Sequence, residues 1–365
     1  MKNSFGSSIV LTLFGESHGE YIGAVVDGLA PGIKINDEYI RAKLSLRRPV
    51  GKISTARVEA DEYEIVSGAF NGFTTGTPLC ILIKNTNKRS SDYGERLDVP
   101  RPGHADFTAR MKYHGFEDHR GGGHFSGRIT AALVAAGAIL GSALESKGIF
   151  IGSHITELHG AFDRPFEDIE ADIRLVNQRQ FPVLSENAEI SMKKEIEKAA
   201  AGGDSVGGIL ESGIIGLPAG LGEPWFDSME SMLSHGLFSI PAVKGVEFGL
   251  GFAFADVYGS EGNDPFYIRD GIVVTESNNN GGINGGITNG MPVIFRTVIK
   301  PTPSIIKEQA SISLSMMEES VLKTVGRHDP AIIHRARAVV DAMAAIVVAD
   351  MLTVRYGTDY LASER

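Results

Sequence analysis

The sequence has little or none of several features on which common protein classes depend. Its one cysteine, Cys80, excludes an internal disulfide framework and favours a reducing compartment, so we expect a cytoplasmic protein. Acidic residues outnumber basic ones, and the net charge of −10 argues against sequence-independent binding of nucleic acid. No run of about 18 consecutive apolar residues occurs, so we expect neither a membrane span nor a secretion signal.

The sequence also lacks the residue spacings of a metal site. The 10 histidines include no H-E-x-x-H or H-x-x-x-H pair, and a single cysteine cannot supply a cluster of thiolates. We therefore predict no metal ion.

The composition that is present is that of a globular protein with a substantial core. The chain has 365 residues, of which 42% are hydrophobic, and its 44 glycines gather in local clusters where a backbone can approach a ligand closely. A glycine-rich loop in each half, at 121–127 and 278–290, raises the hypothesis that the two halves are related. We expect a single domain over residues 1–365.

Strand-like and helix-like segments occur in both halves without the regular alternation of a doubly wound fold. The sequence therefore predicts an α+β fold with layers of helices and mainly antiparallel sheets. We expect strands over 8–14, 22–29, 63–70, 79–84, 149–157, 207–217, 245–254, 271–276 and 291–299. We expect helices over 36–47, with Asn36 as N-cap, and over 104–113, 128–147, 165–180, 188–201, 227–238 and 329–355, the last capped by Asp329.

The segment GESHG at 15–19 has the G-x-S-x-G spelling of a serine-hydrolase nucleophile elbow. Such an elbow places its serine between a strand and a helix. The residues after Gly19 are instead β-branched and glycine-containing and end in Asp27-Gly28, which is typical of a second strand closing in a turn. We predict a turn between two strands that presents Ser17 and His18 together, and this argues against a hydrolase.

A glycine-rich loop precedes a long apolar helix in HRGGGHFSGRITAALVAAGAIL, residues 119–140. Backbone N–H groups, Ser126 and Arg128 at the start of a helix suit a phosphate. The spacing of Gly122, Gly127 and Arg128 approaches that of a P-loop, but the lysine and the magnesium-binding hydroxyl are missing. A site for an anion other than a nucleoside triphosphate is the better interpretation, and close packing of the loop on a sheet is the alternative.

Basic residues gather in a second segment, where Pro49 and Gly51 interrupt the run that contains Arg47, Arg48, Lys52 and Arg57. A loop with several cations can fold around one anion, and a solvated surface is the alternative. A stiff segment, IKPTPSI at 299–305, is suited to presenting hydroxyl and backbone groups to a phosphate or a ring.

Two further segments hold histidines near predicted helix starts. In RPGHAD, Arg101 and His104 flank a Pro-Gly turn, and His104 either caps a helix or takes part in chemistry. In GRHDP, Asp329 is adequate as a helix cap, so that only context can make it catalytic.

Taken together, these segments resemble the chorismate synthase family. The similar segments, in the order of the family, are GESHGEYIGAVVDGLAPG, RRPVGK, TTGTP, NTNKRSSDY, RPGHADFTARMKY, RGGGHFSGR, GDSVGG, GLPAGLGEPWFD, AVKGVEFG, NGGINGGITNG, KPTPSI and GRHDPAIIHRA. The resemblance extends from Gly15 to about residue 355. It implies an α+β sandwich with helices between two antiparallel sheets, assembled as a homotetramer.

The resemblance also implies a reaction. In this family 5-enolpyruvylshikimate 3-phosphate loses phosphate and a ring proton in a 1,4-anti elimination that gives chorismate, a step of the shikimate pathway of aromatic amino acid biosynthesis. The reaction requires reduced FMN although no net redox change occurs. The sequence leaves open whether the chain reduces FMN with NAD(P)H or receives it from a separate flavin reductase.

The resemblance assigns roles to residues by motif position. The substrate would be held by Arg47, Lys52, Arg57, Arg101 and Arg128. The flavin would be bound by His124, Phe125, Ser126, Ala242, Gly285, Lys300, Pro301, Thr302, Pro303, Ser304 and Arg327. The catalytic residues would be His18 as an acid toward the flavin, His104 beside the leaving phosphate, and Asp329 near flavin N5, with Ser17 a polar neighbour rather than a nucleophile.

Three positions depart from the family pattern: Lys52 replaces an arginine, Gly127 an alanine, and Pro241 a polar residue. His328 and His334 have no assigned role, and we expect them to be structural. A non-enzymatic protein that binds flavin or phosphate is the remaining rival interpretation, although such a protein has no need for both His18 and His104.

Overall fold

Two five-stranded antiparallel sheets frame the molecule in the computed structural model, which describes residues 2–49, 51–54, 61–86, 98–323 and 329–362. The first sheet has the order β1 (Ser4–Phe5), β2 (Val10–Gly15), β3 (Tyr21–Asp27), β7 (Leu79–Lys84) and β4 (Tyr63–Ser67). The second has the order β11 (Val243–Phe248), β16 (Val293–Ile299), β10 (Gly208–Ile215), β8 (Phe150–Leu158) and β9 (Ala161–Phe162). The first sheet is built from residues 4–84 and the second from residues 150–299.

Alternating side chains explain why these strands pack on one face. In β7, Leu79, Ile81 and Ile83 are fully buried, while the residues between them are less so. Successive strand residues point to opposite faces, so this pattern turns one face of the sheet toward a core.

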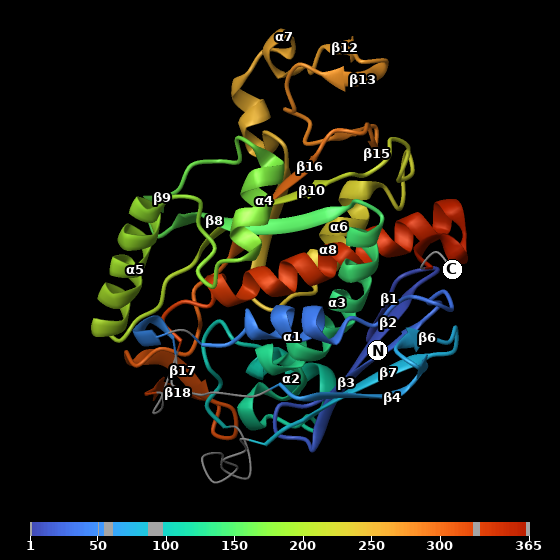
Figure 1. Cartoon of the computed structure of the whole chain (residues 1–365). Helices are drawn as coiled ribbons and strands as arrows, with labels where there is room; N and C mark the ends of the chain where they lie inside the picture. Colours follow the sequence, from blue (N-terminus) through green and yellow to red (C-terminus); the bar gives the residue numbers. More distant parts are fainter. Residues whose placement is uncertain (1, 50, 55–60, 87–97, 324–328, 363–365) are drawn as a thin grey trace.

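Helices fill the space between the two sheets (Figure 1). The layer contains α1 (Asp37–Ser45), α3 (Thr130–Ser146) and α8 (Ile333–Tyr356). Helix α3 packs on β3 and β7, α8 packs on β8 and β10, and the two helices pack on each other. At Gly137 a Cβ atom would lie 2.6 Å from the Cβ of Ala342, so only glycine allows this close approach.

The remaining helices lie around this core. They are α2 (Asp106–Tyr113), α4 (Ile169–Asn177), α5 (Glu186–Ala201), α6 (Met229–Phe238), α7 (Gly259–Gly262), and the 3-10 turns η1 (Gly51–Ile53), η3 (Arg120–Phe125), η4 (Gly127–Ile129), η5 (Gly251–Asp256) and η6 (Thr358–Leu361). Helix α4 covers the outer side of β8 and β10, so the second sheet is covered on both faces.

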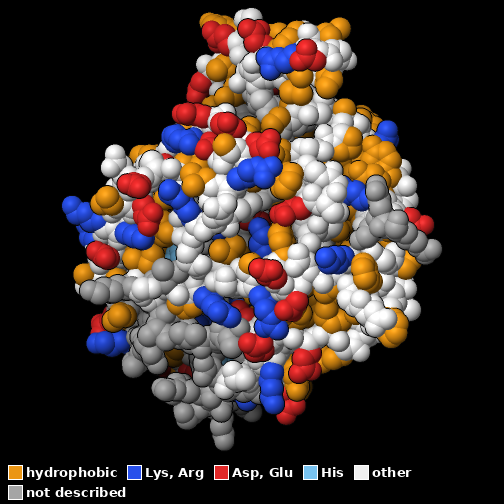
Figure 2. Space-filling view, in the orientation of Figure 1, with side chains coloured by type: hydrophobic (Ala, Val, Ile, Leu, Met, Phe, Trp, Pro, Cys, Tyr) orange, Lys and Arg blue, Asp and Glu red, His pale blue; other side chains and the backbone are white. Residues whose placement is uncertain are grey.

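Four two-stranded pairs complete the described structure: β5 (Ala69–Phe70) with β6 (Phe73–Thr74), β12 (Phe266–Arg269) with β13 (Ile272–Thr275), β14 (Ile283–Asn284) with β15 (Ile287–Thr288), and β17 (Gln309–Ser313) with β18 (Glu318–Leu322). The segment with α7, β12 and β13 projects from the body at the top of Figure 1. Hydrophobic side chains are visible on this projection in Figure 2. Phe252, Tyr258, Phe266 and Ile268 are exposed in this part of the chain.

The α+β prediction is confirmed, as is the N-cap of α1, where the Asn36 side chain accepts a hydrogen bond from Tyr39 N at 3.1 Å. Two predicted boundaries are wrong. The strand expected over 245–254 ends at Phe248, and η5 follows it. Helix α8 begins at Ile333 rather than at Asp329, because the Asp329 carboxylate is bound by Arg335 instead of capping the helix.

One apolar helical segment of the described residues is a core helix. Residues Gly127–Ser146 form a helical segment that is long and apolar enough to cross a membrane, with a mean hydropathy of 1.6. In the structure 78% of that window is buried inside the protein, where it forms α3.

Candidate active site

A cavity of about 850 Å³ opens beside the helical layer, where segments from both halves of the chain meet. Its walls are the N-terminal strands, the glycine loop of η3 and η4, the end of α1, the segment 238–244, the segment 300–304 and the start of α8. The cavity is large enough for more than one small molecule.

The glycine loop follows an unusual backbone path. Gly121, Gly122 and Gly123 all have positive φ angles, of 60°, 86° and 54°. A Cβ atom on Gly121 would lie 2.3 Å from the His18 ring, so the loop can lie against His18 only because this residue is glycine.

Ser17 and His18 lie in the turn between β2 and β3, which confirms the strand–turn–strand prediction. Both side chains are buried, and Ser17 N donates to Gly123 O at 3.0 Å, which ties this turn to the glycine loop. A serine in this setting is not on a nucleophile elbow.

Two arginines with the predicted substrate role are brought together by an aspartate that the sequence did not single out. Asp61 accepts from Arg47 Nη1 at 2.7 Å and from Arg128 Nη1, and all three side chains are buried. Arg128 Nε also donates to Asn85 Oδ1 at 2.8 Å, and Arg47 Nη2 donates to Thr130 Oγ1 at 3.1 Å. Each of these arginines lines the cavity, so they form a cationic wall in an acidic protein.

Arg101 and His104 meet at the buried carboxylate of Asp106, the first residue of α2. Asp106 Oδ1 lies 2.6 Å from His104 Nδ1 and accepts from Arg101 Nη2 at 2.8 Å. Burial alone would raise the pKa of Asp106, but the hydrogen bonds from Arg101 and His104 outweigh it and hold the pKa well below its ordinary value.

Asp329 lines the cavity near the start of α8. Its Oδ2 atom accepts from Arg335 Nη1 at 2.6 Å, and Arg335 Nε donates to Arg47 O at 2.6 Å. Thr302 Oγ1 donates to the Asp329 backbone carbonyl at 2.9 Å. Arg335 thus links Asp329 to the loop that carries Arg47.

Most residues with the predicted flavin role line the cavity. His124, Phe125, Ser126, Ala242, Lys300, Thr302, Pro303 and Ser304 line it. Phe125 is 36% exposed and contacts the edge of Tyr113 at a centroid distance of 6.1 Å, so its ring offers an open apolar surface. Ala242 has a φ of 76°, a backbone angle that is rare without glycine.

Some predicted residues are placed elsewhere. Gly285 lies exposed in the turn between β14 and β15, away from the described cavity lining, and Pro301 turns outward between two residues that do line it. Lys52 lies in η1. Arg57, Arg327 and His328 lie outside the described residues.

Sequence reasoning missed several residues of the cavity wall: Lys2, Ser4, Phe5, Asp61, His235, Lys244 and Arg335. Phe5 and His235 contact each other edge to face at 5.0 Å although 230 positions separate them, and no local motif marks either residue. Asp61 belongs to an acidic run, EADE at 59–62, but no pattern in the sequence indicates that it pairs with Arg47 and Arg128.

His334 lies outside the lining of the larger cavity, as expected for a structural residue. It is fully buried, its Nε2 lies 2.9 Å from Ser54 Oγ, and its ring stacks on Phe181 at 5.8 Å. Burial lowers the pKa of His334 to about 3, and the charges of Arg335 and Lys193 add to this effect. The residue is therefore neutral in the folded protein.

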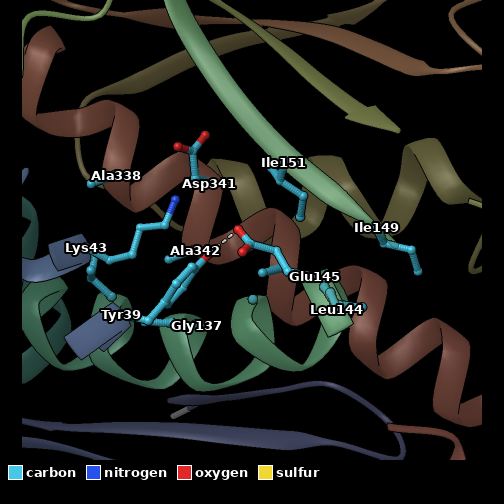
Figure 3. Close-up of a pocket in the computed structure, with 14 residues that line it drawn as sticks. Tyr39, Lys43, Gly137, Leu144, Glu145, Ile149, Ile151, Ala338, Asp341 and Ala342 are labelled. Atoms are coloured by element: carbon cyan, nitrogen blue, oxygen red, sulfur yellow. Dashed lines mark hydrogen bonds between the residues drawn. The ribbon is translucent and has the colours of Figure 1, made fainter. Parts of the chain in front are cut away.

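A second, much smaller cavity of about 20 Å³ lies between α1, α3, α8 and β8 (Figure 3). Tyr39 donates to Glu145 at 2.8 Å across it, and the amino end of Lys43 points toward Asp341. This space is sufficient for about one water molecule and not for a substrate. Among the described residues, no group of three or more His, Cys, Asp or Glu side chains is placed to hold a metal ion.

The fold and the larger cavity define the class of this protein. An α+β sandwich with arginines, histidines and a glycine loop around one cavity is suited to an enzyme that acts on a phosphorylated small molecule. A family model described as chorismate synthase matches residues 9–353.

Comparison with known proteins names the family. The chain is 48% identical over 350 residues to a chorismate synthase of Thermococcus gammatolerans, covering 96% of this chain and 97% of that protein. It is 47% identical over 350 residues to a chorismate synthase of Pyrococcus abyssi, with the same coverage. A crystal structure of chorismate synthase matches with a TM-score of 0.76 at 27% identity, over 98% of this chain and 95% of that one. The chain belongs to the chorismate synthase family and is a carbon–oxygen lyase that acts on phosphates.

Proposed function

We propose that the protein converts 5-enolpyruvylshikimate 3-phosphate to chorismate by 1,4-anti elimination of phosphate, with reduced FMN and without net redox change. The single observation that carries this proposal is the pair of buried arginines, Arg47 and Arg128, on the wall of the larger cavity. An acidic protein that buries two arginines beside a cavity is built to receive an anion.

The substrate supplies a phosphate and two carboxylates for this cationic wall. We assign Arg47 and Arg128 to its anionic groups, together with Lys52 and Arg57 by motif position. Each charge-assisted contact contributes about 1.5–3 kcal/mol, and it acts on the rate where charge grows on the departing phosphate. Lys52 in place of the family arginine makes one contact a point charge rather than a fork.

The described residues fit a flavin. Phe125 offers an open ring, Lys300 a cation, and Thr302 and Ser304 two hydroxyl groups along one side of the cavity. His124, Ser126, Ala242 and Pro303 line the same cavity. Pro301, Gly285 and Arg327 belong to the proposed set by motif position only. Reduced FMN, when bound, supplies electron density for breaking the C–O bond and recovers it as the ring proton leaves.

We assign the proton transfers to three residues of the chain. His104 gives a proton to the leaving phosphate, and His18 acts as an acid toward the flavin. Asp329 assists the removal of the proton that leaves the substrate ring. Arg335 orients Asp329, because it donates to the carboxylate at 2.6 Å.

We further propose a cytoplasmic homotetramer, with reduced flavin supplied by NAD(P)H through this chain or through a separate reductase. The exposed Phe252, Tyr258, Phe266 and Ile268 of the projecting segment support assembly, because such a patch is rare on a monomer. Light scattering after size exclusion that gives a monomer would contradict the homotetramer.

Anaerobic phosphate release from 5-enolpyruvylshikimate 3-phosphate tests the function, with photoreduced FMN compared with oxidised FMN. We expect release and chorismate formation with the reduced flavin only. His18→Ala and His104→Ala should each lower turnover about 100-fold or more while FMN still binds. His159→Ala is the matched control, since His159 is exposed and paired with Glu195 on the surface. Unchanged turnover in both active-site variants would favour the rival interpretation of a binding protein.

A further inference from the structure

The His104 ring is held by a carboxylate that has no assigned role. Asp106 is buried at the start of α2, with 3% of its side chain exposed, and His104 and Arg101 approach it from the preceding turn. The Arg101 guanidinium binds both carboxylate oxygens of Asp106: Nε donates to Oδ2 at 2.8 Å and Nη2 donates to Oδ1 at 2.8 Å. The backbone N–H of Arg101 adds a third bond to Oδ2 at 3.0 Å.

This fork decides which nitrogen of His104 carries the proton. A carboxylate held by an arginine is ionised and can only accept, so the Nδ1 atom 2.6 Å from Asp106 Oδ1 must be the donor. The Nη2 group of Arg101 lies 3.1 Å from the same Nδ1 atom, but it donates to Asp106 and not to a protonated nitrogen. Nε2 is then the nitrogen that is left to gain or lose a proton.

The other edge of the ring faces the glycine loop. A Cβ atom on Gly122 would lie 3.4 Å from both Cε1 and Nε2 of His104, and Gly122 has a φ of 86°. His104 lines the larger cavity together with Gly121, His124 and Ser126 of the same loop. Lys300 is also beside this turn, and its Nζ donates to Gly103 O.

We propose that Asp106 is a positioning residue that holds the Nδ1 proton of His104, so that the protonated ring passes only its Nε2 proton to the departing phosphate. The inference rests on the proposed function. As the C–O bond breaks, its electron pair leaves with the phosphate and the Nε2 proton of the His104 imidazolium moves to a phosphate oxygen. His104 is left neutral, as the Nδ1–H tautomer hydrogen-bonded to Asp106. Arg101 acts on Asp106 rather than directly on substrate.

Asp106→Asn tests the assignment, because the amide keeps the shape of the side chain and can present an N–H to Nδ1. We expect the favoured tautomer to change and kcat to fall about 100-fold or more, with KM altered much less. Asp106→Glu should recover part of the lost turnover.

Asp118→Asn is the matched control. Asp118 accepts from Arg120 Nε and Nη2 at 2.8 Å each, a similar arginine fork on a carboxylate outside the cavity lining. Turnover of the Asp106→Asn variant equal to that of this control would overturn the proposal.

A readout on the resting protein separates this proposal from the proposed function. In protein labelled with nitrogen-15 at histidine, with His104→Gln identifying the signal, we expect Nδ1 of His104 to be protonated in the parent chain and Nε2 in Asp106→Asn. An Nε2–H tautomer in the parent chain would overturn the role of Asp106 even if phosphate is released. The expected tautomer without any phosphate release would contradict only the proposed function.

Discussion

Two groups of buried charges differ in what surrounds them. Arg47 and Arg128 share Asp61 and line a space of about 850 Å³. Arg337, a residue of α8, is fully enclosed, lies 3.6 Å from Asp341 and donates to the carbonyls of Val176 and Arg179 at 3.1 and 2.6 Å.

The difference between the two groups lies in what can replace the carboxylate. A ligand anion or water can reach the arginines of the cavity, whereas the space beside Asp341 is about 20 Å³. Burial lowers the pKa of Arg337, and Asp341 opposes that shift. We infer that the enclosed pair serves stability and that the open group serves binding.

Loss of the enclosed carboxylate should have the largest effect on stability. Asp341→Asn leaves the Arg337 charge buried without its partner, which we expect to lower the free energy of unfolding by about 3–5 kcal/mol. Urea unfolding measures this. Phosphate release per folded molecule should not change, and an altered KM would break the separation between the two groups.

Loss of the cavity carboxylate should cost less, and an added anion should reverse it. Asp61→Asn leaves Arg47 and Arg128 facing a cavity that water reaches, so we expect a loss of about 1–2 kcal/mol. Inorganic phosphate should raise the unfolding midpoint of this variant more than that of the parent chain, because it binds only the folded arginine pair. Equal shifts in the two proteins would show that Asp61 does not occupy an anion site.

The pH dependence of stability sharpens the comparison along α8 itself. The folded-state pKa of His334 is about 3, below its ordinary value of 6.5, so between these values the unfolded chain binds a proton that the folded chain does not. The stability that the folded chain gains from keeping His334 neutral is complete above pH 6.5. It is lost as pH falls, at up to about 1.4 kcal/mol per pH unit. His334→Gln should remove that slope between pH 6.5 and 4.5, as measured by urea unfolding. A slope that persists would place the titration in other groups.

The sequence predicted local features well. The strand over 79–84, the Asn36 cap and the turn at Ser17 depend on neighbouring residues, and each was found where expected. The prediction that Asp329 caps the last helix was wrong, because Arg335 binds its carboxylate.

The rest of the cavity depends on contacts between distant segments. Asp61 reaches Arg128 across 67 positions, and Phe5 meets His235 across the whole first half of the chain and beyond. Such partners follow from how α3 and α8 bring the two sheets together, and no local pattern encodes them.

The most direct test of the account compares two buried arginines, one on the wall of the larger cavity and one fully enclosed. Arg128→Met and Arg337→Met are assayed for anaerobic phosphate release with reduced FMN, each normalised to its folded fraction. We expect Arg128→Met to lose about 10- to 100-fold in kcat/KM, while Arg337→Met stays close to the parent chain per folded molecule. Full activity of Arg128→Met, or a loss confined to Arg337→Met, would contradict the assignment of the larger cavity as the active site.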